Sequence, residues 1–208
     1  MSTLAQLASY VVANYDSLSS TDQEYNSRVT QVTAFGGEVL DDVAQYAEWD
    51  FLFKKANLTF MAGQNYIALP SDFLSMPSQG KIIRPDGAIM EPASMDDVIK
   101  LRQDSFSEAP TIYSITYQIE MTTVPTASAG TGSIYYQMGP TETTQLPTVF
   151  HRGVVLQGMI ARALEVQGNA LSSVYYQRYR TGLADMQRRL RSGKNRPFRF
   201  GMTNPTMY

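Results

Sequence analysis

The residue types that most often perform catalysis are scarce in this chain. It has no cysteine, which excludes disulfides and thiolate metal sites, and a single histidine, His151. A histidine zinc motif such as HExxH needs two histidines, so metal sites built on histidine clusters are excluded by count. His151 comes near the start of an apolar segment, where a helix-cap or interface role is expected rather than that of a catalytic base. We predict no catalytic residue and no metal ligand.

Carboxylates and glycines give no stronger signal for chemistry. Asp41 and Asp42 are adjacent, so they point to different faces of a predicted helix and indicate a solvated surface. Residues 129–132 (AGTG) lie between two predicted strands rather than before a helix, so a phosphate cradle is not expected. A carboxylate pair for glycoside hydrolysis is not excluded, but no pair stands out. We therefore predict a protein that is not an enzyme and has no cofactor.

Charge is segregated along the chain, although the net charge is only -2. Residues 178–199 contain eight basic residues and one acid, a net charge of +7, and the remainder carries -9. Such separation favours head-to-tail contacts between copies, or binding to an acidic partner, because opposite patches attract. The alternative is a solvated basic helix end, which also suits the helix dipole.

The C-terminal segment combines these basic residues with apolar anchors. Helical periodicity ends at Arg191, and residues 192–208 form a tail that contains two prolines. Such a tail is often ordered only on a partner, and fraying of a terminus is the alternative. The candidate partner-docking residues are Arg188, Arg189, Arg191, Lys194, Arg196, Phe198, Arg199, Phe200, Met202 and Tyr208. The same segment could contact nucleic-acid phosphates and stack bases, but the acidic pI of about 5.4 argues against a specific DNA reader.

Four helices of the predicted fold frame the chain. Apolar residues at helical spacing predict a helix over residues 4–15, with Ser2 or Thr3 as its N-cap. A capping box at Thr21 and Glu24 predicts the start of a second helix, which continues through residues 47–55 (AEWDFLFKK). The glycine pair at residues 36–37 suggests a bend or a close helix crossing. Near the C-terminus, an apolar segment over residues 149–166 and a second stripe over residues 171–190 predict an αα-hairpin.

In the middle of the chain, apolar and polar residues alternate as they do in β-strands. Two short strands joined by a turn at residues 62–65 are predicted to form a hairpin that ends at Pro70. Residues 81–90 read as strand, turn, strand, and Ser94 as the N-cap of a short helix. Residues 111–121 give the clearest single strand, followed by a flexible loop at 126–132 and a strand over 133–138.

These elements predict an α+β fold: a helical bundle, made of N-terminal helices and a C-terminal αα-hairpin, with an inserted β-hairpin and antiparallel-sheet region. We predict one domain over residues 1–191, with a helical core at 1–56 and 149–191, a β-rich insertion at 57–138, and a docking tail at 192–208. No apolar run approaches the roughly 20 residues that span a bilayer. At the junction of the two parts we expect a group with a packing role rather than a ligand-binding one: Trp49, Phe51, Leu52, Tyr66, Pro70 and Phe73.

Several short motifs, in this order, resemble the head-to-tail adaptor (connector, or head completion) proteins of tailed bacteriophages. They are Trp49-x-Phe51-Leu52, Leu58-x-Phe60, Gly63-Gln64-x-Tyr66-x-x-Leu69-Pro70-x-Asp72-Phe73, Leu101-Arg102, Ala109-Pro110-x-x-Tyr113-x-Ile115, Leu146-Pro147-x-x-Phe150 and Tyr175-x-x-Arg178-Tyr179. The resemblance covers essentially the whole chain. It departs from the family at residues 122–132, which lack the strand that often ends in two prolines.

The resemblance implies a structural virion protein of the neck, between capsid and tail, which is in the host cytoplasm during assembly. Members form a homo-oligomeric ring of about twelve copies beneath the portal protein. The resemblance also implies that the C-terminal segment docks on the portal, that tail or nozzle proteins bind the ring, and that genomic DNA passes through it without sequence-specific binding. The alternatives are a tail terminator or tail completion ring protein, and a nucleic-acid-binding protein that uses the basic C-terminal segment.

Overall fold

The computed structural model describes residues 2–104 and 109–194 and divides the chain into two compact units. One unit, here called the helical unit, combines residues 1–47 with the chain from residue 142 onward. The other, the strand unit, is residues 48–141. Helices and strands together confirm the predicted α+β class.

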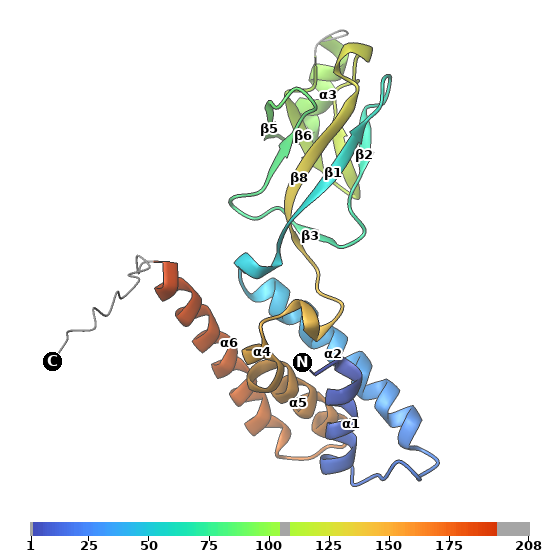
Figure 1. Cartoon of the computed structure of the whole chain (residues 1–208), viewed down its shortest axis with the longest axis vertical. Coiled ribbons are helices and arrows are strands. Elements are labelled where there is room, and N and C mark those ends of the chain that lie inside the picture. Colours follow the sequence, from blue (N-terminus) through green and yellow to red (C-terminus); the bar gives the residue numbers. More distant parts are fainter. Residues whose placement is uncertain (1, 105–108, 195–208) are drawn as a thin grey trace, which may run out of the picture. The chain divides into compact units, whose positions relative to one another are not determined.

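The helical unit is built around α5. Its elements are α1 (Leu4–Tyr15), α2 (Tyr25–Tyr46), the 3-10 turn η3 (Thr143–Gln145), the short α4 (Thr148–Phe150), the π-helical turn η4 (His151–Val155), α5 (Leu156–Val166) and α6 (Ser172–Lys194). Helix α5 packs against α1, α2 and α6, so most of its circumference is buried, as its apolar composition predicts (Figure 1). Helices α5 and α6 form the predicted αα-hairpin.

The predicted N-cap is found at α1 but not at α2. Thr3 caps α1 in a capping box, with its Oγ1 accepting from the Gln6 backbone at 3.2 Å and Gln6 Oε1 accepting from the Thr3 backbone at 3.0 Å. The predicted capping box of α2 is wrong. Glu24 makes no side-chain cap bond, and the Thr21 hydroxyl bonds to Ser19 Oγ at 2.7 Å in the preceding turn.

Gly36 and Gly158 are among the glycines at which the helices of this unit approach closely. A Cβ at Gly36 would lie 2.7 Å from Leu4 Cδ2, and one at Gly158 would lie 2.8 Å from Val39 Cγ2. The close crossing predicted at the glycine pair is therefore confirmed at Gly36, where α1 packs on α2. A Cβ at Gly37, by contrast, would meet nothing within 4 Å.

The predicted continuation of the second helix through residues 47–55 is wrong. Helix α2 ends at Tyr46, a 3-10 turn η1 (Asp50–Leu52) follows, and β1 begins at Phe53. Residues 53–60 pair along their whole length with the last strand of the unit. The apolar residues of this stretch suit either periodicity, and only the pairing with a strand far away in the sequence decides between them.

The strand unit is one mostly antiparallel sheet that coils toward a barrel (Figure 1). Its elements are β1 (Phe53–Phe60), β2 (Tyr66–Ala68), β3 (Phe73–Ser75), β4 (Lys81–Ile83), β5 (Ile89–Pro92), α3 (Met95–Asp104), β6 (Ile112–Ile115), β7 (Gln118–Met121), the 3-10 turn η2 (Thr126–Ser128) and β8 (Gly130–Met138). The strand order is β1-β8-β4-β5-β6-β7-β2, and β3 also pairs with β8. Only β5 and β6 run parallel among the described pairs. The core includes Phe60, Ile82, Ile119, Ile134 and Tyr136.

Two predicted strand arrangements need correction. The strands on either side of the turn at Gly63 exist, but they do not form a hairpin: β1 pairs with β8 and β2 pairs with β7. Residues 111–121 are not one strand but the tight hairpin β6–β7. Alternation continues through this hairpin because Ile115 lies opposite Ile119, which keeps the apolar residues on one face while Tyr117 is 83% exposed at the tip.

Other local predictions for this unit hold. Strands β4 and β5 form the predicted hairpin, with Gly87 at a φ of 88° in its turn. Ser94 caps α3 by accepting a hydrogen bond from the Asp97 backbone at 3.2 Å. The predicted boundary between the loop at 126–132 and the last strand, by contrast, is wrong, because strand β8 begins at Gly130 and pairs with β1 from there.

Candidate interaction surfaces

The predicted docking residues are divided between described and undescribed parts of the chain. Arg188 and Arg189 are exposed near the C-terminal end of α6, where Arg188 donates to Asp185 Oδ1 at 2.7 Å. Arg191 and Lys194 lie in the last turns of the same helix. The remaining predicted residues lie outside the described residues: Arg196, Phe198, Arg199, Phe200, Met202 and Tyr208. Docking by this segment therefore stays a prediction.

The predicted junction residues lie in the first part of the strand unit. Trp49 and Leu52 are buried, and the Phe51 ring stacks on Trp49 with centroids 5.6 Å apart. Phe73 is half-buried and stacks on the core residue Tyr136 at 5.7 Å. Pro70 is half-buried, whereas Tyr66 is 44% exposed on β2.

Asp72, within the same motif, forms a polar group at the edge of the sheet. Its carboxylate accepts hydrogen bonds from Lys54 Nζ and from the Tyr136 hydroxyl. Burial raises the pKa of Asp72, but these hydrogen bonds outweigh it and hold the pKa below its ordinary value. Burial, with the neighbouring Asp72, raises the pKa of Tyr136. The pair is a neutral phenol donating to a carboxylate, which is a structural arrangement.

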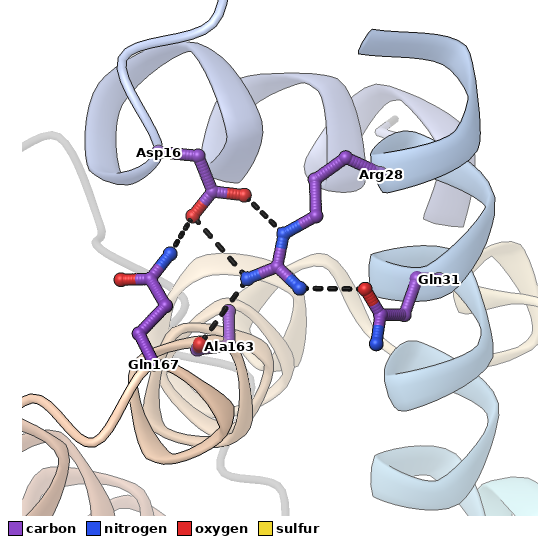
Figure 2. Close-up of polar contacts among 5 residues, drawn as sticks. All are labelled: Asp16, Arg28, Gln31, Ala163 and Gln167. Atoms are coloured by element: carbon purple, nitrogen blue, oxygen red, sulfur yellow. Dashed lines mark hydrogen bonds and ion pairs between the residues drawn. The ribbon is translucent and has the colours of Figure 1, made fainter. Parts of the chain in front are cut away.

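A second polar cluster, the Arg28 clasp, joins three segments of the helical unit (Figure 2). The Arg28 guanidinium pairs with Asp16 and donates to Gln31 Oε1 at 2.6 Å and to the Ala163 carbonyl oxygen at 3.2 Å. Gln167 donates to the same Asp16 carboxylate. Asp16 follows α1, Arg28 lies in the first turns of α2, and Ala163 lies in the last turn of α5.

The Arg28 clasp satisfies groups that the helices themselves leave unpaired. The last four carbonyls of a helix have no partner within it, and Ala163 is one of these in α5. Both charged side chains are largely shielded, with 14% of the Arg28 side chain and 5% of the Asp16 side chain exposed. The clasp therefore fixes how α1, α2 and α5 meet, and its charges are not available to a ligand.

The strand unit has a corresponding Arg102 clasp. Arg102 of α3 donates to Glu120 Oε2 at 2.6 Å, to the Met121 carbonyl at 2.7 Å and to the Asn65 carbonyl at 2.8 Å. Gln118 donates to the other Glu120 oxygen at 2.6 Å. Burial raises the pKa of Glu120, but the hydrogen bonds from Arg102 and Gln118 prevail and lower it. The clasp holds α3 on the end of the β6–β7 hairpin.

The Tyr175-x-x-Arg178-Tyr179 motif lies on α6 and contacts the rest of the helical unit. The hydroxyls of Tyr175 and Tyr15 are 3.2 Å apart, and their rings meet edge to face at 5.6 Å. This hydrogen bond, with burial, raises the pKa of Tyr15 to about 12. Arg178 lies over the Tyr175 ring at 5.1 Å, and Tyr179 is buried. The motif joins α6 to α1, and Arg178 remains exposed.

A basic and aromatic row on the strand unit was missed by the sequence analysis. Lys55 of β1 and Lys81 of β4 both lie over the ring of Tyr135 on β8. The sequence signal was the alternation of apolar residues at Ala56, Leu58 and Phe60, which predicts a strand with Lys55 on its opposite face. Placing Lys55 at the end of a helix concealed this row.

In the helical unit, a hollow of about 470 Å³ is lined by Asp42, Arg162 and Glu165 among others, and Arg162 pairs with Asp42 there. A groove of about 360 Å³ between β1 and β2 is lined by uncharged residues, including Asn57, Thr59 and Tyr66. His151 is buried, with its Nε2 3.3 Å from the Leu146 carbonyl oxygen. Within residues 2–104 and 109–194, no three acidic or histidine side chains are grouped to hold a metal ion. None of the helices described is long and apolar enough to cross a membrane.

Comparison with known proteins gives one positive result. A family model described as SU10 adaptor protein matches residues 2–200, which is nearly the full chain. No curated protein matches the chain significantly.

Proposed function

We propose that this chain, which belongs to the SU10 adaptor protein family of phage structural proteins, forms the ring that joins the capsid portal to the tail of a tailed bacteriophage. The observation that carries this proposal is the family match over residues 2–200, because it includes both units and the start of the C-terminal segment. In the virion such a ring would occupy the neck and surround the DNA channel.

The distribution of charge supports assembly into a ring. A closed ring needs heterologous contacts, in which one face of a copy meets a different face of the next. Opposite charges at separate positions suit such contacts, and the chain carries +7 over residues 178–199 against -9 elsewhere. We propose a ring of about twelve copies, with the helical unit as its body.

The C-terminal segment is the proposed portal-docking element. Helix α6 continues to Lys194 and presents Arg188 and Arg189 to solvent near its end. The segment that follows adds Phe198, Phe200 and further basic residues. Basic side chains steer the encounter with an acidic surface, and aromatic side chains supply apolar area once the surfaces meet.

Deletion of residues 195–208 tests the docking element while leaving α6 whole. We expect the truncated chain to keep its far-UV circular dichroism and Trp49 fluorescence but to lose capture by purified portal rings in a pull-down. A variant that carries the same 14 residues in scrambled order is the matched control, and it should also fail because the apolar anchors are displaced.

Undiminished capture by the truncated chain would contradict docking through this segment. Failure of the full-length chain to bind portals, together with binding to tail tubes, would contradict the portal adaptor and favour a tail completion ring. Electron microscopy of the portal mixed with the protein would show the ring directly.

A further inference from the structure

The row of Lys55, Tyr135 and Lys81 runs straight across three strands. Lys55 of β1 and Lys81 of β4 are both direct register partners of Tyr135 on β8, one from each side. Their ammonium nitrogens lie 5.5 Å and 5.2 Å from the centroid of the Tyr135 ring. The Phe53 ring, 6.1 Å from Tyr135, extends the row on β1. Two cations are thus held at one ring on the face of the sheet opposite the core.

This face of β1, β8 and β4 carries no acidic residue. Its exposed and half-buried positions are Phe53, Lys55, Asn57, Thr59, Lys81, Ile83, Thr131 and Tyr135, whereas Ser133 and Gln137 on this face of β8 are buried. The strand unit as a whole is acidic, with ten acidic and six basic residues in its sequence. The neighbouring strand β5 carries Glu91, yet among the described residues neither Lys55 nor Lys81 forms an ion pair. Positive charge is therefore concentrated on one face of an acidic unit.

Core packing does not explain the row. Two ammonium groups beside one ring repel each other, and each cation–π contact at an exposed site stabilises the fold by only about 0.5–1 kcal/mol. Lys54, the next residue on β1, shows the other arrangement: it points to the opposite face and pairs with Asp72. Among the residues that the structure describes, Lys55 and Lys81 have no such partner, which makes them available to an anion from outside.

The geometry also indicates which part of a nucleic acid would be bound. Both lysines lie over the Tyr135 ring, so that ring is covered by cations and is not free to stack on a base. Lysine is a compact point charge suited to phosphate, and the exposed Asn57 and Thr59 side chains can donate to phosphate oxygens. Such contacts position a backbone without reading its sequence.

We propose that this face of the strand unit contacts the phosphate backbone of double-stranded DNA, with Lys55 and Lys81 as the phosphate-binding residues. The inference rests on the proposed ring, because it assigns the surface that meets the DNA passing through it. Two contacts in each copy are weak and easily broken, and a ring repeats them around the duplex. DNA is thereby held loosely and without preference for sequence.

The test compares two double variants of the full-length chain that lose the same charge. Lys55→Gln/Lys81→Gln removes the row, whereas Lys54→Gln/Lys100→Gln removes two lysines that lie outside it. Binding to a labelled duplex of mixed sequence is measured by fluorescence anisotropy over a range of NaCl concentrations. Each phosphate contact contributes about −0.9 to the slope of log K against log salt concentration. The slope of the first variant should therefore be shallower by about 2, and its affinity at low salt should be about tenfold lower. The control should keep the wild-type slope.

Repeating the comparison without residues 195–208 separates the row from the basic tail. The difference between the two variants should persist in this background. Equal slopes for both variants, or no salt-dependent DNA binding by the wild-type chain, would overturn the proposal. Tighter binding of single strands that is lost in Tyr135→Leu would overturn it as well, because it would show base stacking.

Portal capture distinguishes this inference from the proposed function. The Lys55→Gln/Lys81→Gln variant should be captured by portals as well as the wild type. Lost capture with an unchanged DNA slope would show that the row binds a protein, which would overturn the inference alone. A wild-type chain that binds DNA through the row but never binds portals would refute the proposed function and leave the DNA contact in place.

Discussion

Arg28 in the helical unit and Arg102 in the strand unit are shielded arginines that each join a carboxylate to distant backbone carbonyls. Arg28 donates to one carbonyl, that of Ala163, whereas Arg102 donates to two, those of Asn65 and Met121. A helix leaves only its terminal carbonyls unpaired, so Arg28 acts at the end of α5. A coiled sheet leaves carbonyls where strands end, so Arg102 acts at the end of β7. The same side chain thus completes two kinds of secondary structure.

Gly158 of the helical unit and Gly132 of the strand unit also differ in what they approach. At Gly158 in the helical unit, a Cβ would meet the Val39 side chain at 2.8 Å. At Gly132 in the strand unit, it would meet the Ile83 carbonyl oxygen at 2.3 Å and the Phe60 ring at 2.6 Å. A side chain can turn aside more easily than a paired backbone can shift. Gly132 is therefore expected to be less tolerant of change than Gly158.

The largest effect is expected from Gly132→Ala, which should destabilise the strand unit by about 3 kcal/mol or more because backbone and core both obstruct the new methyl group. Gly158→Ala should destabilise the helical unit by about 1 to 3 kcal/mol. Urea unfolding measures both: Trp49 fluorescence reports on the strand unit, and ellipticity at the helix band reports mainly on the helical unit.

Two glycines with free space serve as controls for these variants. A Cβ at Gly139 would have no neighbour closer than 4.0 Å, and one at Gly37 would have none within 4 Å. Gly139→Ala should be nearly neutral, and Gly37→Ala should stabilise α2 by about 0.5 to 1 kcal/mol. A Gly132→Ala variant as stable as Gly139→Ala would contradict the difference between the units.

The next effect concerns the two clasps. Arg28→Met and Arg102→Met each remove the charged partner of a shielded carboxylate, which then keeps only a glutamine donor, and also a hydrogen bond to at least one carbonyl, so each should cost about 2 to 3 kcal/mol. Arg28→Met should lower the midpoint of the helical transition first, and Arg102→Met that of the Trp49 transition. Coincident loss of both signals in either variant would show instead that the units unfold as one.

The smallest effect concerns pH. The pKa of Glu120 is lower in the folded chain than in the unfolded one, so its ionised form stabilises the fold. This contribution is complete above the unfolded pKa of about 4.3 and is lost as pH falls through the folded pKa. Glu120→Gln should therefore lose stability at neutral pH and show a shallower decline in acid, measured by urea midpoints of Trp49 fluorescence. A decline as steep as the wild type's would contradict this role.

Local signals predicted much of the fold because they involve residues close together in the chain. The N-cap predicted at Ser2 or Thr3 lies at Thr3, and the turn at Gly87 and the cap at Ser94 are confirmed as well. In each case the partners lie within four residues of each other. The docking residues beyond Lys194 stay predictions. The end of α2 was misread because Phe53 and its neighbours fit a helix or a strand equally well, and their partner on β8 is about 80 residues away.

Pairing between distant strands explains the other errors. The turn at Gly63 is present, but a turn alone does not determine which strands pair. Strand β1 pairs with β8, and β2 pairs with β7. The alternation over residues 111–121 is equally compatible with one strand and with a tight hairpin, because the paired residues Ile115 and Ile119 are four positions apart, and this even separation preserves the period of two. Neither ambiguity can be resolved from neighbouring residues.

By itself, the sequence determined the α+β class, the caps of α1 and α3, the separation of charge and the resemblance to phage adaptors, because composition, period and motif order are properties of the chain. The tertiary structure alone decided the strand order, the Arg28 and Arg102 clasps and the row at Tyr135. Each of these joins residues that lie far apart in sequence, and their juxtaposition depends on register and helix packing. Lys55 and Lys81 are unremarkable in the sequence, and only their shared partner on β8 makes them a candidate DNA contact.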